Sequence, residues 1–189
     1  MSIESSKKSV EILCIGTEIL LGDILNSNAR WLAQELAGLG LPHYIQTVVG
    51  DNPLRIKEAV INSSERSNIL IITGGLGPTP DDLTIESLAS LFKAQLYKSK
   101  EVWEDILLKL TCKDEKLAKC NQKQALLPIG SKVINNPRGT APGMIWEPQP
   151  NFTILTFPGV PFEMKAMWLE TAKPWLINSG LVSEKFTSK

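Results

Sequence analysis

A short apolar run, Ile69–Ile72, leads directly into a glycine-rich turn that extends from Thr73 to Asp82. Such a uniformly apolar and largely β-branched run is typical of a central parallel strand that is covered on both faces. Two further strand-like runs precede it, at Val10–Gly16 and Leu41–Gly50, and amphipathic segments separate the three runs. Alternating strands and helices with short links predict right-handed crossovers and a parallel sheet, so we expect an α/β fold.

Capping and breaking residues mark the expected helices. The segment 28–39 is predicted to be helical with Ser27 as its N-cap, and Asn52-Pro53 begins the next helix. In the last helix, Pro174 is expected to end or kink the chain at Lys173. The residues that we expect on the core face of that helix are Phe162, Ala166, Leu169 and Ala172.

The length of 189 residues suits one domain. We expect residues 1–9 to form a disordered N-terminal tail, residues 10–177 the domain, and residues 178–189 a polar C-terminal tail. Lys+Arg and Asp+Glu are equal at 20 each, so no net positive charge favours nucleic acid or a membrane surface as a partner. The polar N-terminus resembles no signal peptide and no apolar run could span a bilayer, which predicts a cytoplasmic protein.

Histidine and cysteine usage limits the possible chemistry. His43 is the only histidine, so a metal site with two histidines is impossible, and we expect a structural role for it. Cys14 lies in an apolar run and is expected to be buried, whereas Cys112 and Cys120 are expected to be free thiols in a polar helical stretch.

The carboxyl ends of the predicted strands carry the candidate site, because ligands of open α/β sheets bind there. The glycine-rich turn supplies backbone amides next to a helix start, an arrangement that suits a phosphate. The candidate phosphate-binding residues in this turn are Thr73, Gly74, Gly75, Gly77 and Thr79. The turn is neither a Walker A motif nor a dinucleotide fingerprint.

A purely structural interpretation of the same turn stays open. Thr79, Pro80 and Asp82 fit the N-cap, first and third positions of a capping box. One carboxylate suffices for such a cap, so the second of Asp81 and Asp82 is free to hold a divalent cation beside a phosphate.

Other candidates lie in the remaining strand-end loops and in two later motifs. Asp51 and Glu163 are candidates for catalysis and metal binding respectively, although a solvated turn and a favourable helix dipole explain them equally well. The further candidate ligand contacts are Glu18, Asp23, Asn121, Lys123, Arg138, Gly139, Thr140 and Gly159.

Five motifs together resemble the N-terminal domain of the CinA family. They are GTEILLGDILNSNARWLAQEL, TGGLGPTPDD, NQKQALLP, NPRGTAPGM and FPGVPFEM, and the likeness extends from about Val10 to Trp175. That domain is similar to the molybdopterin-binding MoaB and MogA proteins, which implies a three-layer α/β/α sandwich with a mostly parallel central sheet.

The resemblance implies metal-dependent hydrolysis of the pyrophosphate bond of ADP-ribose or a related nucleotide, giving AMP and ribose 5-phosphate. Its alternatives are molybdopterin binding with adenylyl transfer, or a non-catalytic nucleotide-binding module. The implied cofactor is Mg²⁺, Mn²⁺ or Co²⁺, with potassium as a further candidate. By motif position, Asp51 and Asp82 are the catalytic aspartates, and Asp81, Asp82 and Glu163 are candidate metal ligands.

For the assembly we expect a homo-oligomer, either a dimer or a trimer. Trp103, Trp146 and Trp168 are candidates for its surface, although scattered tryptophans more often belong to a core. CinA proteins usually continue into an amidohydrolase domain that this chain does not contain, so such a domain is a candidate partner.

Overall fold

The computed structural model describes residues 9–110 and 120–180. It contains a six-stranded sheet in the order β2-β1-β3-β8-β7-β6. The strands are β1 (Val10–Ile15), β2 (His43–Val49), β3 (Ile69–Thr73), β6 (Lys132–Ile134), β7 (Gly143–Gln149) and β8 (Phe152–Phe157). Strands β1, β2, β3 and β8 pair in parallel, whereas β7 and β6 pair antiparallel, which confirms the mostly parallel sheet.

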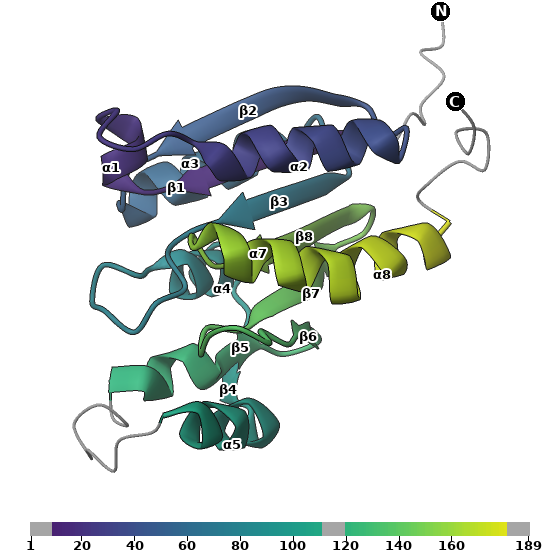
Figure 1. Ribbon diagram of the computed structural model, residues 1–189. Helices are drawn as coiled ribbons and strands as arrows, with labels where there is room; N and C mark the ends of the chain where they lie inside the picture. Colours follow the sequence, from purple (N-terminus) through teal and green to yellow (C-terminus); the bar gives the residue numbers. More distant parts are fainter. Residues whose placement is uncertain (1–8, 111–119, 181–189) are drawn as a thin grey trace, which may run out of the picture.

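Helices cover both faces of this sheet and complete three layers (Figure 1). One layer is formed by α2 (Ser27–Gly38), α7 (Pro161–Met167), the π-helical turn η2 (Trp168–Ala172) and α8 (Lys173–Asn178). The opposite layer is formed by α3 (Pro53–Ser64) and α4 (Thr84–Leu91), and α5 (Lys100–Lys109) packs against the same apolar cluster from beyond the edge of the sheet. Each layer has its own apolar cluster against the sheet, because alternate residues of a strand point to opposite faces. The three-layer prediction is therefore confirmed.

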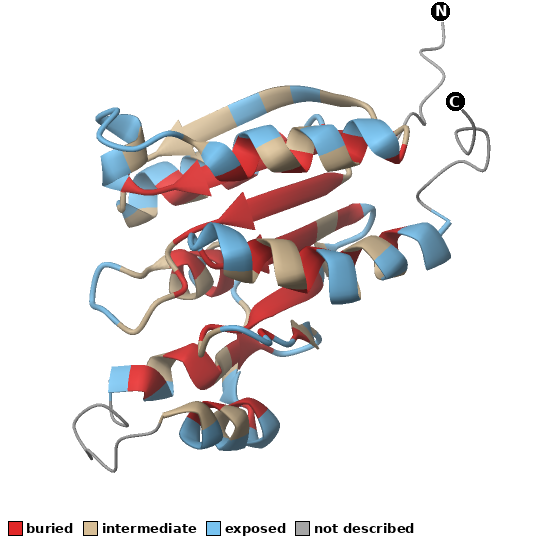
Figure 2. Cartoon of the chain, viewed as in Figure 1, coloured by how far each residue is buried: buried red, intermediate tan, exposed pale blue. Residues whose placement is uncertain are grey.

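The strands β1, β3 and β8 form the centre of the molecule. All six residues of β1 and all five of β3 are buried, as the uniformly apolar runs predicted. In Figure 2 these strands are red beneath helices whose outer sides are exposed. Cys14, Trp146 and Trp168 are also buried, so these two tryptophans belong to the core, and Trp103 is partly buried against it.

A smaller unit lies beyond the edge of the main sheet. It pairs β4 (Leu96–Lys98) with β5 (Leu126–Pro128) and includes α5 and the 3₁₀ turn η1 (Gln122–Ala125). This unit occupies the lower part of Figure 1. Residues 120 and 121, the described end of the expected polar helical stretch, are helical and lead into this turn, and Cys112 lies outside the described residues. So do residues 1–8 and 181–189 of the two expected tails.

Three local predictions were wrong. Asn26, not Ser27, caps α2, since its side chain accepts from the amide of Ala29. The helix after the glycine-rich turn begins at Thr84 with Leu83 as N-cap, so Thr79 caps no helix. In the last helix Ala172 is buried as predicted, but Phe162 and Leu169 are 59% and 52% exposed, and the buried residues there include Met164, Met167 and Trp168.

The π-helical turn explains why the last helix continues through Pro174. Pro174 lies at the start of α8 and does not end the helix, because the wider turn η2 directly precedes it. A π-turn accommodates the carbonyl that a proline ring would otherwise strike. His43 begins β2 as expected, and its Nδ1 lies 3.0 Å from the carbonyl oxygen of Val10. None of the helices in the described ranges is both long and apolar enough to cross a bilayer.

Candidate functional site

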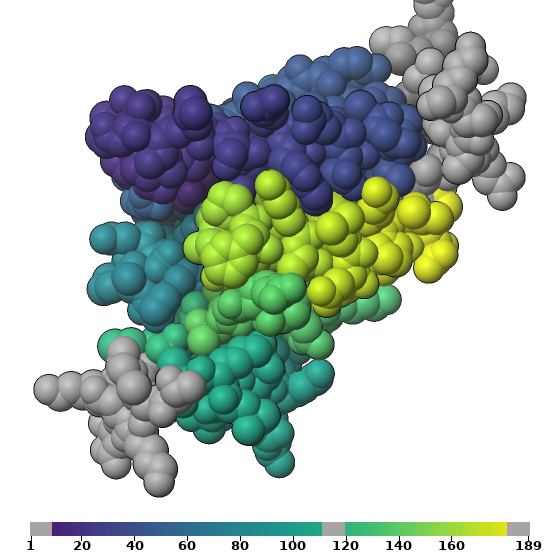
Figure 3. All heavy atoms as spheres, in the orientation of Figure 1, coloured from purple at the N-terminus to yellow at the C-terminus, as the bar shows by residue number. Residues whose placement is uncertain are grey.

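An open pocket of about 660 Å³ lies at the carboxyl ends of β1, β3 and β8. We call it the strand-end pocket. In Figure 3 the segments that surround it meet at the left of the molecule: α1 (Thr17–Leu20) in dark purple, the glycine-rich loop in teal and the start of α7 in yellow-green. Its lining residues are Ile15, Gly16, Glu18, Ile19, Ile24, Asp51, Thr73, Gly74, Gly75, Leu76, Gly77, Pro78, Thr79, Asp81, Asp82, Gln124, Thr140, Ala141, Pro158, Gly159, Val160, Pro161 and Glu163.

The glycine-rich loop, residues 74–82, packs so tightly that its glycines have a structural reason of their own. Gly74 and Gly75 have φ values of +101° and +65°. A Cβ atom at Gly74 would lie 2.0 Å from the carbonyl oxygen of Ile15, and one at Gly75 would lie 2.2 Å from Oγ1 of Thr84. These positions therefore require glycine for the fold, whether or not a ligand approaches them.

Hydrogen bonds from two other segments hold this loop in place. The Oγ1 of Thr84 donates to the carbonyl of Gly74 over 2.9 Å, and the amide of Thr84 donates to the carbonyl of Gly75 over 3.2 Å. Turn η1 contributes Nε2 of Gln124, 3.1 Å from the carbonyl of Leu76. These contacts use the carbonyl groups of Gly74, Gly75 and Leu76 and none of their amides, of which the amide of Gly74 donates to the carbonyl of Phe157.

Three consecutive amides of the loop are free to bind an anion. The amides of Gly75, Leu76 and Gly77 donate to no other group in the part of the chain that the structure describes. All three residues line the strand-end pocket. Successive unpaired backbone amides can form a concave site for anions, and phosphate binding by this turn stays a prediction.

Asp82 bends back on the loop instead of capping α4. Its Oδ2 accepts from the amide and from Oγ1 of Thr79, over 2.9 and 2.6 Å. The carboxylate also lies over Gly77, where a Cβ atom would approach it to 2.5 Å. The other oxygen, Oδ1, accepts no hydrogen bond within residues 9–110 and 120–180 and remains available at the pocket.

Asp51 joins the second strand-end loop to the first. Its Oδ2 accepts from the amide and Oγ1 of Thr17, over 2.9 and 2.8 Å, and its own amide donates to Oγ1 of Thr17. This pair fixes the start of α1 at the rim of the strand-end pocket. A solvated turn aspartate would have none of these contacts, although the contacts alone assign it no chemistry.

Glu163 is held by a residue that the sequence did not single out. Nδ2 of Asn136 donates to Oε2 of Glu163 over 2.7 Å, and Oδ1 of Asn136 accepts from the amides of Arg138 and Gly139. Asn136 is 2% exposed, so it organises the 137–141 turn from inside. The only sequence signal for it is its place directly before Pro137, where asparagine commonly begins a turn.

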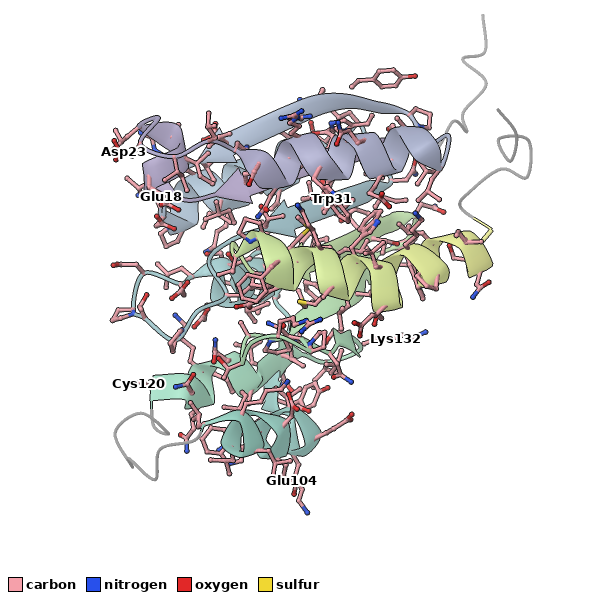
Figure 4. All side chains as sticks on the ribbon, in the orientation of Figure 1. Glu18, Asp23, Trp31, Glu104, Cys120 and Lys132 are labelled. Carbon is pink, nitrogen blue, oxygen red and sulfur yellow. The ribbon has the colours of Figure 1, made fainter. Side chains whose placement is uncertain are left out.

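The structure brings most of the candidate residues together and leaves five outside the pocket. Asp23 lies on the exposed segment after α1, as Figure 4 shows beside Glu18. Arg138 faces a groove on the outer side of α7, and Gly139 lies behind the carboxylate of Glu163. Lys123 donates to the carbonyl of Thr79, and Asn121 is buried beside it.

The charge of the strand-end pocket is one-sided. Glu18, Asp51, Asp81, Asp82 and Glu163 line it, and no lysine, arginine or histidine of the described chain does. No three Asp, Glu, His or Cys side chains in the described ranges lie close enough together to enclose a metal ion. A hard cation fits such a site when one or two carboxylates and the phosphates of a ligand share it, which is how Mg²⁺ is commonly bound.

Comparison with known proteins identifies the family. The model of a family described as "Probable molybdopterin binding domain" matches residues 11–178. A crystal structure of the protein CinA from Thermoplasma acidophilum, described as having unknown function, superimposes with a TM-score of 0.82 at 31% identity, over 89% of this chain and 99% of that one. The chain belongs to the CinA family.

The curated relatives are longer than this chain, and proteins outside the CinA family share its fold. A CinA-like protein of Prochlorococcus marinus is 60% identical over all of this chain, which spans 44% of that relative. The chain therefore covers less than half of the length of such curated relatives. The structure of MoaB from Thermus thermophilus superimposes with a TM-score of 0.60 at 20% identity, over 94% of this chain and 98% of that one, and shows the shared MoaB-type fold.

Proposed function

We propose that the strand-end pocket binds the diphosphate of a nucleotide together with a divalent cation and hydrolyses its pyrophosphate bond. ADP-ribose, cleaved to AMP and ribose 5-phosphate, is the proposed substrate. The observation that carries the proposal is the combination of three free loop amides with five carboxylates and, among the residues that the structure describes, no basic side chain. The amides suit an anion, whereas the carboxylates would repel one that arrived alone.

Simple electrostatics shows why a cation belongs in the proposal. Two unit charges about 10 Å apart at an effective dielectric constant of about 20 repel by ~1.7 kcal/mol. Several carboxylates acting together would therefore outweigh the few hydrogen bonds that the loop amides offer to a bare diphosphate. A divalent cation that accompanies the phosphates removes most of this repulsion, with Mg²⁺, Mn²⁺ and Co²⁺ as the candidates and K⁺ as a further one.

The loop amides and the carboxylates of the strand-end pocket would have different roles in this reaction. The amides of Gly75, Leu76 and Gly77 would bind phosphate oxygens, and the unpaired oxygen of Asp82 would hold the cation together with one further carboxylate, from Asp51, Asp81 or Glu163. When bound, the cation would neutralise phosphate charge and lower the pKa of a water molecule. Water adds to one phosphorus, the bridging P–O bond breaks, and a carboxylate of the pocket accepts the proton.

The size and lining of the pocket agree with a nucleotide. A volume of about 660 Å³ falls within the range of small-molecule sites. Ile19, Ile24 and Val160 add apolar surface against which a planar base can pack. The same surface would suit a pterin, and the family description favours molybdopterin binding as the second candidate.

AMP release tests the proposal directly. The chain is incubated with ADP-ribose and each of Mg²⁺, Mn²⁺, Co²⁺ and K⁺, and AMP is measured by chromatography. We expect metal-dependent release that falls at least about a hundredfold in Asp82→Asn and in Glu163→Gln. The matched control is Glu104→Gln, on the exposed face of α5 at the opposite end of the view in Figure 4.

Three other outcomes are informative. An absence of AMP with every cation would refute hydrolysis of ADP-ribose. Saturable binding of molybdopterin in that case would favour the second candidate, and binding of ADP-ribose without turnover would indicate a non-catalytic nucleotide module.

A further inference from the structure

Gln124 has a polar atom that the fold leaves unused. The residue is 7% exposed and lines both the strand-end pocket and a small hollow behind the glycine-rich loop. Its Nε2 donates to the carbonyl of Leu76 over 3.1 Å, while its Oε1 is buried and accepts from no group in the described chain. A buried carbonyl oxygen without a donor destabilises the free protein, so its retention calls for a partner.

The orientation of this amide follows from its contact. If the side chain were turned over, Oε1 would face the carbonyl oxygen of Leu76, and two acceptors would repel each other. The unpaired atom is therefore the oxygen. Asn28 and Ser87 also carry a buried polar atom without a partner, but neither residue lines the strand-end pocket. Gln124 alone combines an unpaired buried acceptor with a place in the pocket wall, among the residues that the structure describes.

We infer that Oε1 of Gln124 accepts a hydrogen bond from an O–H group of the ligand, namely a ribose hydroxyl beside the diphosphate. An ionised phosphate offers acceptors only, so it cannot satisfy this oxygen. The neighbouring loop amides are the proposed phosphate site, so a sugar attached to that phosphate is the nearest source of a donor. The inference rests on the proposed function and adds to it the group that selects the sugar.

The test compares two glutamines of the same turn. Gln124→Met keeps the length of the side chain and removes the acceptor, and Gln122→Met makes the same change at an exposed position of η1. The dissociation constant of the α,β-methylene analogue of ADP-ribose, which resists hydrolysis, is measured by calorimetry with Mn²⁺. We expect binding about tenfold weaker in Gln124→Met and unchanged in Gln122→Met.

Deoxy analogues separate a ligand contact from a merely structural role. Gln124→Met also loses the bond to Leu76, which could shift the loop and weaken every ligand equally. If the inference holds, one of the deoxyribose analogues binds the wild type about tenfold more weakly, and Gln124→Met weakens that analogue no further. A displaced loop would weaken the parent ligand and all of its deoxy analogues by the same factor, and this result would overturn the inference.

The remaining outcomes also decide the matter. Unchanged binding in Gln124→Met overturns the inference while the proposed function stands. A loss that disappears at high Mn²⁺ concentration would make Oε1 a cation ligand and overturns it as well. If the wild type binds no nucleotide analogue at all, the proposed function itself fails and this inference fails with it.

Discussion

Replacing Gly74 by alanine tests whether the glycine-rich loop is fixed by packing. The new Cβ atom would lie 2.0 Å from the carbonyl oxygen of Ile15, so one of the two must move by about 1 Å to reach the shortest separation that real structures tolerate. Alanine at φ +101° adds ~1–2 kcal/mol of backbone strain. The shift also threatens the 3.0 Å hydrogen bond from the amide of Gly74 to Phe157, with a loss of about 1 kcal/mol.

Together these effects predict that Gly74→Ala lowers the free energy of unfolding by roughly 3 kcal/mol. For a domain of this size that corresponds to a melting temperature about 6–12 °C lower. Urea denaturation followed by tryptophan fluorescence gives the free energy, and a thermal scan gives the melting temperature.

Two other glycines supply graded controls. Gly22 has φ +83°, and a Cβ atom added there would lie in open space. Gly22→Ala should therefore lower the free energy of unfolding only by the backbone strain, ~1–2 kcal/mol. Gly38 ends α2, also in open space and without a positive φ, so Gly38→Ala should be neutral or stabilise by up to about 1 kcal/mol. If Gly74→Ala costs no more than Gly22→Ala, the packing argument for the loop is wrong.

Three further changes follow from single contacts. Thr84→Val leaves the carbonyl of Gly74 without its buried donor and should cost about 1–2 kcal/mol by urea denaturation, whereas Thr84→Ser should cost less. Arg66→Ala removes both hydrogen bonds to the buried carboxylate of Glu11 and should cost about 1–3 kcal/mol, with partial recovery in an added Glu11→Gln change. Burial raises the pKa of the Cys14 thiol, so folding favours its protonated form. The free energy that this group contributes to folding is fully present below the usual thiol pKa of about 8.5 and is lost as the pH rises through the raised pKa. Cys14→Ala should abolish this pH dependence of the stability.

Each of these predictions has a result that would contradict it. Thr84→Ser that destabilises as much as Thr84→Val would show that the hydroxyl is not the stabilising group. An Arg66→Ala variant with unchanged stability would mean that the carboxylate of Glu11 is solvated after all. A stability profile above pH 8.5 that is the same in Cys14→Ala and the wild type would assign the dependence to other groups.

The sheet was predictable because its central strands carry an unambiguous pattern. Residues 69–72 are apolar at every position and largely β-branched, and glycines follow directly, which favours a short strand buried on both faces over a helix. Parallel strands also converge at one edge by geometry, so the loops after β1, β2, β3 and β8 could be assigned to one region before any contact was known.

The last helix could not be oriented from its pattern. Both the stripe through Phe162 and Leu169 and the stripe through Met164 and Met167 are apolar, so the helical period fits either face. Packing of Trp168 against Phe157 and Trp31 decides between them, and its Nε1 donates to Glu35 over 3.0 Å. The contacts with Trp31 and Glu35 join positions more than a hundred residues apart, which helical periodicity cannot indicate.

The loop that surrounds the site was only half predictable for a related reason. The turn signals at Thr79-Pro80 are local, and they suggested a helix start at once. In the fold, Thr84 donates hydrogen bonds to the carbonyl groups of Gly74 and Gly75, and α4 begins only at Thr84, after the loop. The contact from Gln124 comes from a distant segment, so nothing near the loop in sequence indicates it.

The anchoring of the glycine-rich loop at its carbonyls means that the backbone around the proposed ligand site is already restrained before any ligand binds. Since Thr84, Gln124 and Lys123 already restrain the backbone, binding needs to immobilise little of the protein and forfeits little entropy. The proposed ligand should then bind without a rearrangement of the loop, so the association rate constant should depend on diffusion and charge and not on loop closure.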